Sequence, residues 1–317
     1  MRIALVTPAR PGSRAGNLHT AQRWARFLRA AGHSVGVMRE WQAGQPADLL
    51  LALHARRSHA SIKTFAERFP QRPLLLALTG TDIYRDIHES AAARESLRLA
   101  TRFIALQREA ALELPVRLRG KLRVVVQSCA SNLRHDPARR GFRICVIGHL
   151  RAEKDPLRVL DALKRIPRET PIEVVHLGRA LDDALERRAR AAAAADPRYR
   201  WLGGVTHSRA LSWLASSHAM LISSRMEGGA NVLSEAIRIG VPVLASRIPG
   251  NVGLLGRGYP AYYPVGDGAA LARLLLRAAG DPRFYASLKR GIAALRPMVA
   301  PENEARMLLN AIRVRGA

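Results

Sequence analysis

Short runs of consecutive apolar residues alternate along the chain with segments in which apolar residues return every three or four positions. In the first half, the runs cover 2–7, 34–38, 48–53, 74–78, 102–106 and 122–126. Consecutive apolar residues are typical of strands buried on both faces of a parallel sheet. The segment "NLHTAQRWARFLRAAG" (17–32) between the first two runs has the helical period instead. The alternation predicts an α/β domain with helices covering a parallel sheet.

The same alternation restarts after a polar, Arg- and Pro-rich segment, "SNLRHDPARRG" (131–141), which we interpret as the linker. The second set of runs covers 142–150, 172–178, 200–205, 219–224 and 241–246, with helices expected at 155–166, 181–195, 207–216, 231–239 and 268–280. We therefore expect two doubly wound, Rossmann-like domains, at 1–135 and 136–300. A C-terminal helix within 301–317 is expected to pack back across them. Ligands of such sheets bind beyond the carboxyl ends of the strands, which places function in the loops that follow strands.

Length and charge narrow the class of protein. A chain of 317 residues suits two domains, and no apolar run approaches the roughly 20 residues of a membrane span. The apolar run at the N-terminus is too short for a signal peptide, so we expect a cytoplasmic protein, in which Cys129 and Cys145 stay reduced. The net charge is +26, but its arginines are dispersed rather than clustered. This dispersion favours small anionic ligands over nucleic acid, although a non-enzymatic nucleic-acid binder remains the alternative from another class.

The segment "SSRMEGGANVLSEAIRIGVPVLAS" (223–246) is the strongest candidate for a binding site. Gly228 and Gly229 follow a predicted strand and allow a ligand to approach the backbone closely, and the helix expected to start near Asn231 has a first turn that attracts phosphate. Glu227 and Glu235 suit neutral sugar hydroxyls, because a carboxylate accepts their hydrogen bonds. The alternative is a surface helix with a favourable acid near its N-terminus.

A second loop supplies positive charge. In "IGHLRAEKDP" (147–156), Arg151 and Lys154 follow the first strand of the second domain. A guanidinium and an ammonium at this position could bind a diphosphate and stabilise the charge that develops on a departing nucleotide.

These two segments, together with "WLGGVTHSRALSWL" and the N-terminal "TPARPGSRAGNLHTAQRWARFLRAAGHSV", resemble the GT-B nucleotide-sugar glycosyltransferases. The most similar group is the retaining one in which two glutamates are separated by seven residues, as Glu227 and Glu235 are. The resemblance covers nearly the whole chain and implies two Rossmann-like domains that face a cleft.

The resemblance also implies roles for individual residues. Arg151, Lys154 and Glu227 would be catalytic, with the first two on the diphosphate and Glu227 facing the donor sugar, and Glu235 would hold the ribose hydroxyls. The remaining donor-binding residues would be Gly148, Gly204, Val205, Gly228, Gly229, Ala230, Asn231 and Val232. A UDP-sugar would be the donor substrate, with no cofactor and no metal. No metal-binding Asp-x-Asp motif is present in the sequence.

The first domain would bind the acceptor. The family often has His-Gly-Thr-Asp in the loop after the fourth strand, whereas this chain has "LTGTD", with Thr79 at the histidine position. Asp82 remains, although an Asp at a helix start is a common cap. The basic loops around Arg14 and in "LHARRSH" (53–59) suggest a small oxyanion as acceptor. The expected acceptor-binding residues are Arg14, Gly16, Asn17, His54, Arg56, Thr79 and Asp82.

Several of these segments together resemble one branch of the family, the selenosugar synthases of selenoneine biosynthesis. This resemblance implies transfer of a sugar, N-acetylglucosamine or glucose, from UDP to selenophosphate. Selenium in selenophosphate is already an anionic nucleophile, so no protein base is needed. Two alternatives within the fold stay open: transfer to a hydroxyl of a sugar, lipid or small metabolite, and nucleotide-sugar 2-epimerisation. The second needs acid/base carboxylates that the first domain largely lacks.

Overall fold

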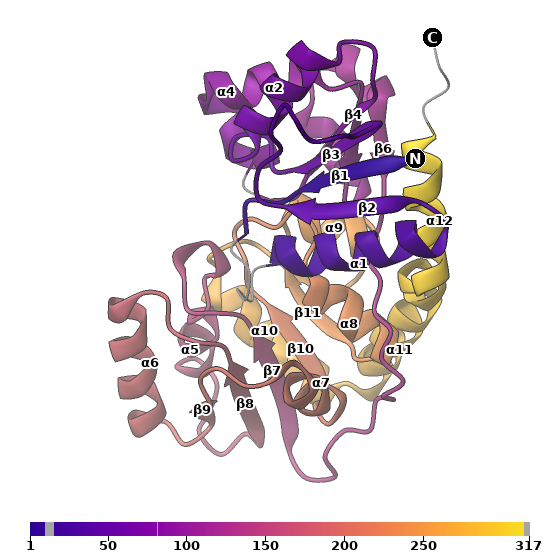
Figure 1. The fold of residues 1–317 in the computed structure, drawn as a ribbon. Coiled ribbons are helices and arrows are strands. Elements are labelled where there is room, and N and C mark those ends of the chain that lie inside the picture. Colours follow the sequence, from indigo (N-terminus) through magenta and orange to yellow (C-terminus); the bar gives the residue numbers. More distant parts are fainter. Residues whose placement is uncertain (10–15, 81, 314–317) are drawn as a thin grey trace. The chain divides into compact units, whose positions relative to one another are not determined.

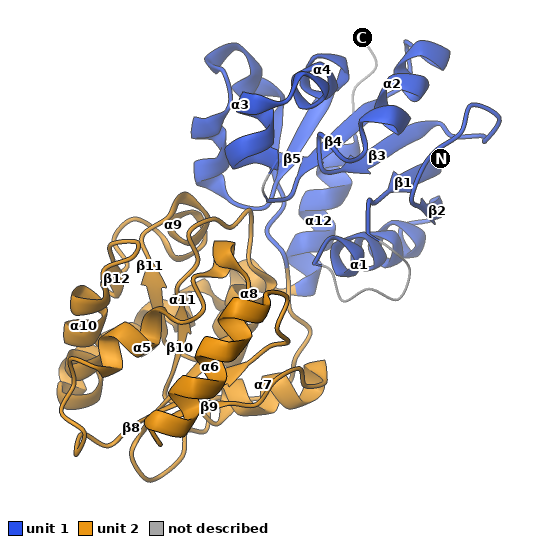
Figure 2. Ribbon diagram, turned by 90° about the vertical axis from the view of Figure 1, so that its left-hand side faces the viewer, with its two compact units in different colours: residues 1–127, 301–317 blue, residues 128–300 orange. Residues whose placement is uncertain are grey.

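The computed structural model describes residues 1–9, 16–80 and 82–313. The chain divides into two compact units (Figure 2). Unit 1 comprises 1–127 and 301–317, and unit 2 comprises 128–300. Each unit is built on one parallel sheet.

The sheet of unit 1 has the strand order β2-β1-β3-β4-β5-β6, and all its pairs are parallel (Figure 1). The strands are β1 (Arg2–Val6), β2 (Ser34–Met38), β3 (Leu49–Leu53), β4 (Leu74–Leu78), β5 (Arg102–Ala105) and β6 (Leu122–Val124). Each lies within one of the six apolar runs, so this part of the prediction is confirmed. The order reverses between β1 and β3, which makes their carboxyl ends the switch point of the sheet.

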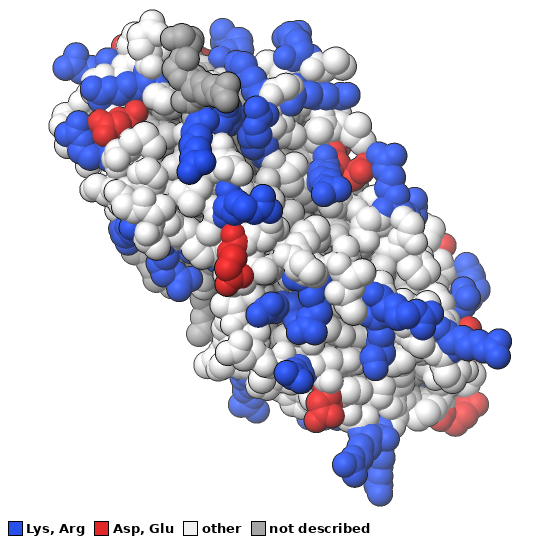
Figure 3. Space-filling view, turned by 90° about the vertical axis from the view of Figure 1, so that its right-hand side faces the viewer, with Lys and Arg blue, Asp and Glu red and all other residues white. Residues whose placement is uncertain are grey.

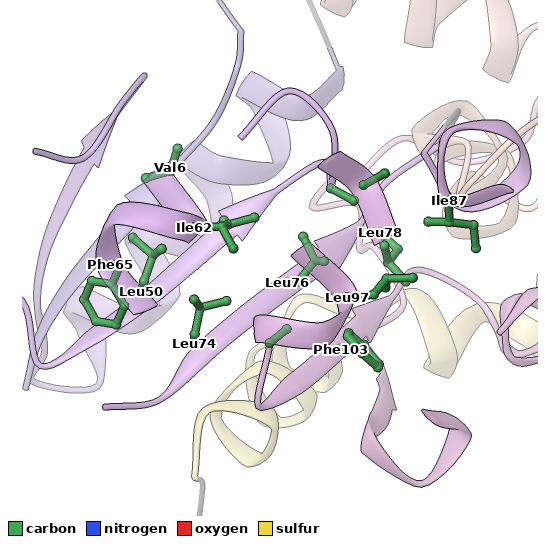
Figure 4. Close-up of a cluster of buried hydrophobic side chains, with 14 of the residues drawn as sticks. Val6, Leu50, Ile62, Phe65, Leu74, Leu76, Leu78, Ile87, Leu97 and Phe103 are labelled. Carbon is green, nitrogen blue, oxygen red and sulfur yellow. The ribbon is translucent and has the colours of Figure 1, made fainter. Parts of the chain in front are cut away.

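Helices cover both faces of this sheet because successive strand residues point to opposite sides. Leu50 and Ala52 belong to a core cluster that includes residues of α2 (His59–Arg68) and α4 (Ala91–Leu99), shown in Figure 4. Leu49 and Leu51 belong to the opposite cluster, with residues of α1 (Gly16–Ala30) and α12 (Pro301–Ile312). The C-terminal helix, drawn yellow in Figure 1, is therefore part of unit 1.

A buried polar contact holds α12 against α1. Glu304 is fully buried: it accepts a hydrogen bond from Trp24 Nε1 at 2.8 Å and forms an ion pair with Arg23, whose Nε lies 2.8 Å from Oε2. Replacing Glu304 with alanine removes the acceptor of Trp24 and the charge partner of Arg23. We expect the free energy of unfolding to fall by about 2–4 kcal/mol. Chemical denaturation followed by tryptophan fluorescence measures the loss. Glu302→Ala is the matched control, because it makes the same change on an exposed position of the same helix and should cost little.

The sheet of unit 2 has the order β12-β11-β10-β7-β8-β9, again with all pairs parallel. Numbered from its first strand, this is the Rossmann order 3-2-1-4-5-6. Its strands are β7 (Phe142–Ile147), β8 (Ile172–Leu177), β9 (Tyr199–Trp201), β10 (Ala219–Ile222), β11 (Val243–Ser246) and β12 (Tyr262–Tyr263). Its α-helices are α5 (Arg158–Leu163), α6 (Asp183–Ala195), α7 (His207–Ala215), α8 (Asn231–Ile239), α9 (Pro249–Leu255), α10 (Gly268–Gly280) and α11 (Pro282–Leu295).

The main difference from the expected organisation concerns the segment interpreted as a linker (131–141) and the domain boundary near it. Residues 128–135 belong to unit 2, so the boundary lies after Gln127 rather than after residue 135. The amides of Cys129, His135 and Asp136 donate to the carbonyls of Val299, Ile239 and Ala215. A polar composition suggested a linker, but several backbone amides of this segment donate hydrogen bonds to carbonyls elsewhere in unit 2. The sequence pattern also missed β12, α9 and α11.

The charge distribution agrees with the dispersed pattern of the sequence. On the face shown in Figure 3, Lys and Arg side chains are scattered among uncharged residues, with few Asp or Glu. Cys145 lies fully buried in β7, where burial raises the pKa of its thiol to about 12, so it behaves as a small apolar residue. Within the described ranges, every helix is too short or too polar to cross a membrane.

Candidate active site

Most candidate donor residues of unit 2 lie after β7 and β10, the two strands at the switch point of its sheet. The two strands are neighbours, so the loops that follow them leave the sheet side by side. Ser223 Oγ donates to the carbonyls of Lys154 and Asp155, at 3.0 and 2.9 Å. The amide of Arg225 donates to the carbonyl of Glu153 at 2.9 Å. These bonds hold two loops against each other: the basic loop after β7 (148–156) and the Glu-Gly-Gly loop between β10 and α8 (223–230).

An ion pair between Lys154 and Glu227 joins the two loops. Lys154, at the end of the short helix Ala152–Lys154, donates through Nζ to Glu227 Oε1. Glu227 also accepts from Ser224 Oγ at 2.6 Å. The two charged side chains are only 19% and 10% exposed, so they interact in surroundings that screen charge less than bulk water does. A sugar or phosphate that reaches this point meets a carboxylate and an ammonium together.

A glycine makes room for Glu227. Gly250, at the start of α9, lies so close that a Cβ there would be 2.0 Å from the carbonyl oxygen of Glu227. Any side chain at this position would displace the Glu-Gly-Gly loop. Ser246 Oγ supports the same loop from β11 by donating to the carbonyl of Ser224 at 2.6 Å.

Helix α8 begins at Asn231, at the position predicted from the sequence. Its N-cap is Ala230, which has no side-chain oxygen to cap the N–H groups of the first turn. A helix start of this kind, directly after two glycines, suits the binding of an anion. The first turn of α8 contains no acidic residue that would repel one.

Glu235 lies one turn into α8, and its carboxylate is paired with a histidine. His207, the first residue of α7, contacts Glu235 Oε1 through Nε2 at 2.8 Å. The Glu235 side chain is 14% exposed, whereas the His207 ring is largely in solvent. Among the described residues, none bonds to the second oxygen of Glu235, which can accept a ligand hydroxyl.

The pair makes the stability of unit 2 depend on pH. The hydrogen bond with Glu235 raises the pKa of His207, although partial burial opposes the shift. Because the pKa is higher in the folded state, the contribution is complete below the unfolded value of about 6.5 and is lost as pH rises through the raised pKa. We expect wild type to exceed His207→Ala in unfolding free energy near pH 6 and the difference to vanish by about pH 9. Urea unfolding across this range measures it, and a difference that does not change with pH would contradict the assignment.

The loops after β7, β8 and β9 approach each other through glycines. A Cβ on Gly178 would lie 2.0 Å from the carbonyl oxygen of Gly148, and Trp201 Nε1 donates to the carbonyl of Gly178 at 2.8 Å. Gly203 has a φ of 65°, which directs the chain from β9 through Gly204 and Val205 to α7. The backbone of this turn is where the resemblance places the nucleotide base. The role of this turn stays a prediction.

In unit 1, four expected acceptor residues lie in the loops after β3 and β4: His54, Arg56, Thr79 and Asp82. Asp82 is fully buried, and its oxygens accept from the amides of Ala55, Thr79 and Gly80 at 2.8 to 3.3 Å. This is neither the expected ligand contact nor an ordinary helix cap. The carboxylate ties together the loops after two neighbouring strands, and it exposes no surface to an acceptor.

His54 and Arg56 lie in the same network. His54 has a φ of 78°, which is uncommon for a residue with a side chain, and burial lowers the pKa of its imidazole. Its Nε2 lies 3.7 Å from Asp86 Oδ2, and Arg56 Nε donates to that oxygen at 2.9 Å. Burial alone would raise the pKa of Asp86, but Arg56 lowers it below its usual range. Arg56 is 45% exposed and is the member of this group that an anion can reach.

The other acceptor residues are less defined. Thr79 is half-buried beside Asp82, while Gly16 and Asn17 form the start of α1. Arg14 lies outside the described residues, so its predicted role stays a prediction. In unit 2, Arg151 is exposed, and none of the described residues pairs with its side chain. The described ranges contain no group of three or more His, Cys, Asp or Glu side chains arranged to hold a metal ion.

Sequence reasoning missed several residues that shape these sites. Ser224, His207, Gly250 and Asp86 contact or make room for predicted residues. Ser224 and His207 could have been found, because Ser224 lies in the loop after β10 and His207 begins a helix, where ligand sites of such sheets lie. The roles of Gly250 and Asp86 depend on contacts between segments remote in sequence.

Both units are doubly wound α/β sheets, with their candidate residues at the carboxyl ends of strands. The family model of glycosyl transferases group 1 matches residues 134–292, half of the chain, and the chain belongs to this family. It is a glycosyltransferase.

Solved structures share the whole fold. Anabaena HepE in complex with UDP has a TM-score of 0.79 at 17% identity, covering 98% of this chain and 99% of that one. HepE was also solved with UDP-glucose. Sucrose-phosphate synthase from Thermosynechococcus elongatus has a TM-score of 0.76 at 16% identity, covering 98% of both chains. The lipopolysaccharide outer core galactosyltransferase WaaB has a TM-score of 0.74 at 14% identity, covering 98% of this chain and 99% of that one. The fold of this chain is therefore GT-B.

Proposed function

We propose that this glycosyltransferase moves a sugar, N-acetylglucosamine or glucose, from its UDP derivative to selenophosphate. The UDP-sugar donor is supported by one group of residues. It comprises Lys154, Glu227 and the start of α8, which has no side-chain cap, with Glu235 one turn further on. Basic and acidic groups alternate along it in the way a nucleotide-sugar requires, with cations for the diphosphate and carboxylates for hydroxyls. The UDP and UDP-glucose bound to HepE support this choice of donor.

Positive charge from the protein replaces a metal in this proposal. Arg151 and Lys154 would stabilise the negative charge that grows on UDP as the bond to the sugar breaks. Lys154 would exchange part of its contact with Glu227 for the diphosphate, and Glu227 would then be available to the sugar. We therefore expect transfer to proceed in the presence of a chelator.

The choice of an anionic acceptor is supported by the basic segment 53–59 of unit 1. Arg56 is held by Asp86 and remains accessible, and the neighbouring Arg57 is exposed. A small dianion suits such a loop better than a neutral sugar. Selenium would attack the anomeric carbon as the bond to the UDP oxygen breaks, forming a carbon–selenium bond and releasing UDP. Hydrolysis of the phosphorus–selenium bond would then yield the selenosugar and phosphate. The buried, neutral His54 is not required as a base.

Incubation of the enzyme with UDP-sugars and selenophosphate under anaerobic, reducing conditions tests the proposal. Mass spectrometry should detect a product that carries selenium bonded to the sugar, with an equal amount of UDP. Release of UDP only when a hydroxyl acceptor is supplied would refute selenophosphate while leaving the donor assignment intact. Absence of UDP binding in calorimetry would refute the donor assignment itself.

A further inference from the structure

Unit 1 contains a hollow that none of the candidate site residues line. Its volume is about 470 Å³, within the roughly 300–1,000 Å³ of small-molecule pockets. It lies between α3 (Ile87–Glu89) and α4 on one side and the 3-10 helices Arg108–Glu113 and Val116–Lys121 on the other. Its floor is apolar, formed by Ile87, Leu97, Leu114 and Leu118. Figure 4 shows Ile87 and Leu97 at the same end of the core cluster of unit 1.

The rim of the hollow is basic. Arg94 and Arg98 lie one turn apart on α4, a spacing at which like charges destabilise a helix unless an anion offsets them. Arg117 lines the hollow from the facing segment. None of the described residues forms an ion pair with these three guanidiniums. The single carboxylate in the lining, Glu113, already faces His88 Nε2 at 3.6 Å.

Two exposed apolar residues are sequence neighbours of residues that line the hollow. Val116 is 77% exposed and Leu112 is 55% exposed, each on one of the two 3-10 helices that form the wall. Exposed apolar side chains beside an apolar hollow with a cationic rim favour a ligand that has both an aliphatic part and an anionic part.

From this combination we infer that the hollow binds an amphipathic anion, with its aliphatic chain on the floor and its phosphate or carboxylate head against Arg94, Arg98 and Arg117. The ligand is a single soluble molecule rather than a membrane surface, because the floor lies inside a defined cavity. The site lies wholly in unit 1 and does not depend on the donor proposed for unit 2.

Isothermal titration of the whole protein with hexyl, octyl and decyl phosphate, each below its micelle concentration, tests this inference. Burial of each methylene should tighten binding about fourfold, until the hollow is filled. Inorganic phosphate should bind far more weakly than decyl phosphate. An affinity that does not change with chain length would overturn the inference, since it would show that only charge is recognised.

Four variants locate the site. Ala91→Trp places a large ring in the hollow from an exposed position of α4 and should weaken decyl phosphate at least tenfold. Arg98→Gln and Arg117→Gln should each weaken it about fivefold, whereas Glu113→Gln should tighten it about twofold to fivefold by removing the one nearby negative charge. Arg26→Gln on α1 is the matched control, because it removes an exposed arginine over the opposite face of the same sheet.

The affinity for UDP should be unchanged in all these variants, so the result is separable from the fate of the proposed donor site. Equal binding of decyl phosphate by wild type and by Ala91→Trp, with Arg98→Gln and Arg117→Gln also unchanged, would overturn the inference. Binding to phosphatidylglycerol vesicles without binding to monomeric decyl phosphate would overturn it as well, because it would identify a membrane contact instead of a pocket.

Discussion

Replacing Lys154 with alanine should lower kcat for sugar transfer by about a hundredfold, the usual effect of removing one charged donor from a developing negative charge. Two losses combine in this variant. In the proposed mechanism the departing diphosphate would lose an ammonium group, and Glu227 loses the cation that holds it. Glu227 is left with Ser224 Oγ as its remaining side-chain donor. Initial rates of UDP release at saturating donor measure the effect.

Lys164→Ala is the matched control, since Lys164 is exposed at the end of α5 in the same unit and should leave kcat unchanged. A double-mutant cycle sharpens the interpretation. Because Lys154 and Glu227 form a hydrogen-bonded ion pair, the effects of Lys154→Ala and Glu227→Gln on the activation free energy should not be additive. Additive effects would show that the pair does not act as a unit, and an unchanged kcat in Lys154→Ala would remove Lys154 from the chemistry.

The strands and helices were largely predictable because buried parallel strands leave a simple mark in the sequence. β2, β4 and α8 begin and end where the apolar pattern placed them. The segment after Gln127 was not predictable in the same way, because a polar composition does not distinguish a free linker from a chain whose amides bond to a neighbouring domain. β12 has only two residues, too few to show a pattern.

The candidate donor site was predictable in its charged residues but not in its supports. The spacing of Glu227 and Glu235, and a basic loop after the first strand of the second domain, are visible in the sequence. The contact between Lys154 and Glu227 spans 73 positions and becomes visible only once β7 and β10 are neighbours. Asp82 shows the converse case. Its position in a loop suggested a ligand contact, and only the buried amides around it reveal a structural carboxylate.

The second large effect concerns Glu235. Its replacement by alanine should weaken UDP binding by roughly 30- to 150-fold, equivalent to about 2–3 kcal/mol for hydrogen bonds between ribose hydroxyls and a charged acceptor. Calorimetric titration with UDP measures the change. Glu235→Gln should lose less, because an amide oxygen still accepts a hydrogen bond without the charge.

Two comparisons separate ligand recognition from the support of α8. Glu186→Ala removes a half-buried carboxylate of α6 that is paired with Arg190, and it should leave UDP affinity unchanged. His207→Ala breaks the ion pair between His207 and Glu235 but keeps the Glu235 carboxylate, so it should cost far less UDP affinity than Glu235→Ala. Equal losses in His207→Ala and Glu235→Ala would mean that the pair, rather than the carboxylate, is what UDP requires. In that case Glu235 would act by positioning the start of α7 and not by contacting ribose.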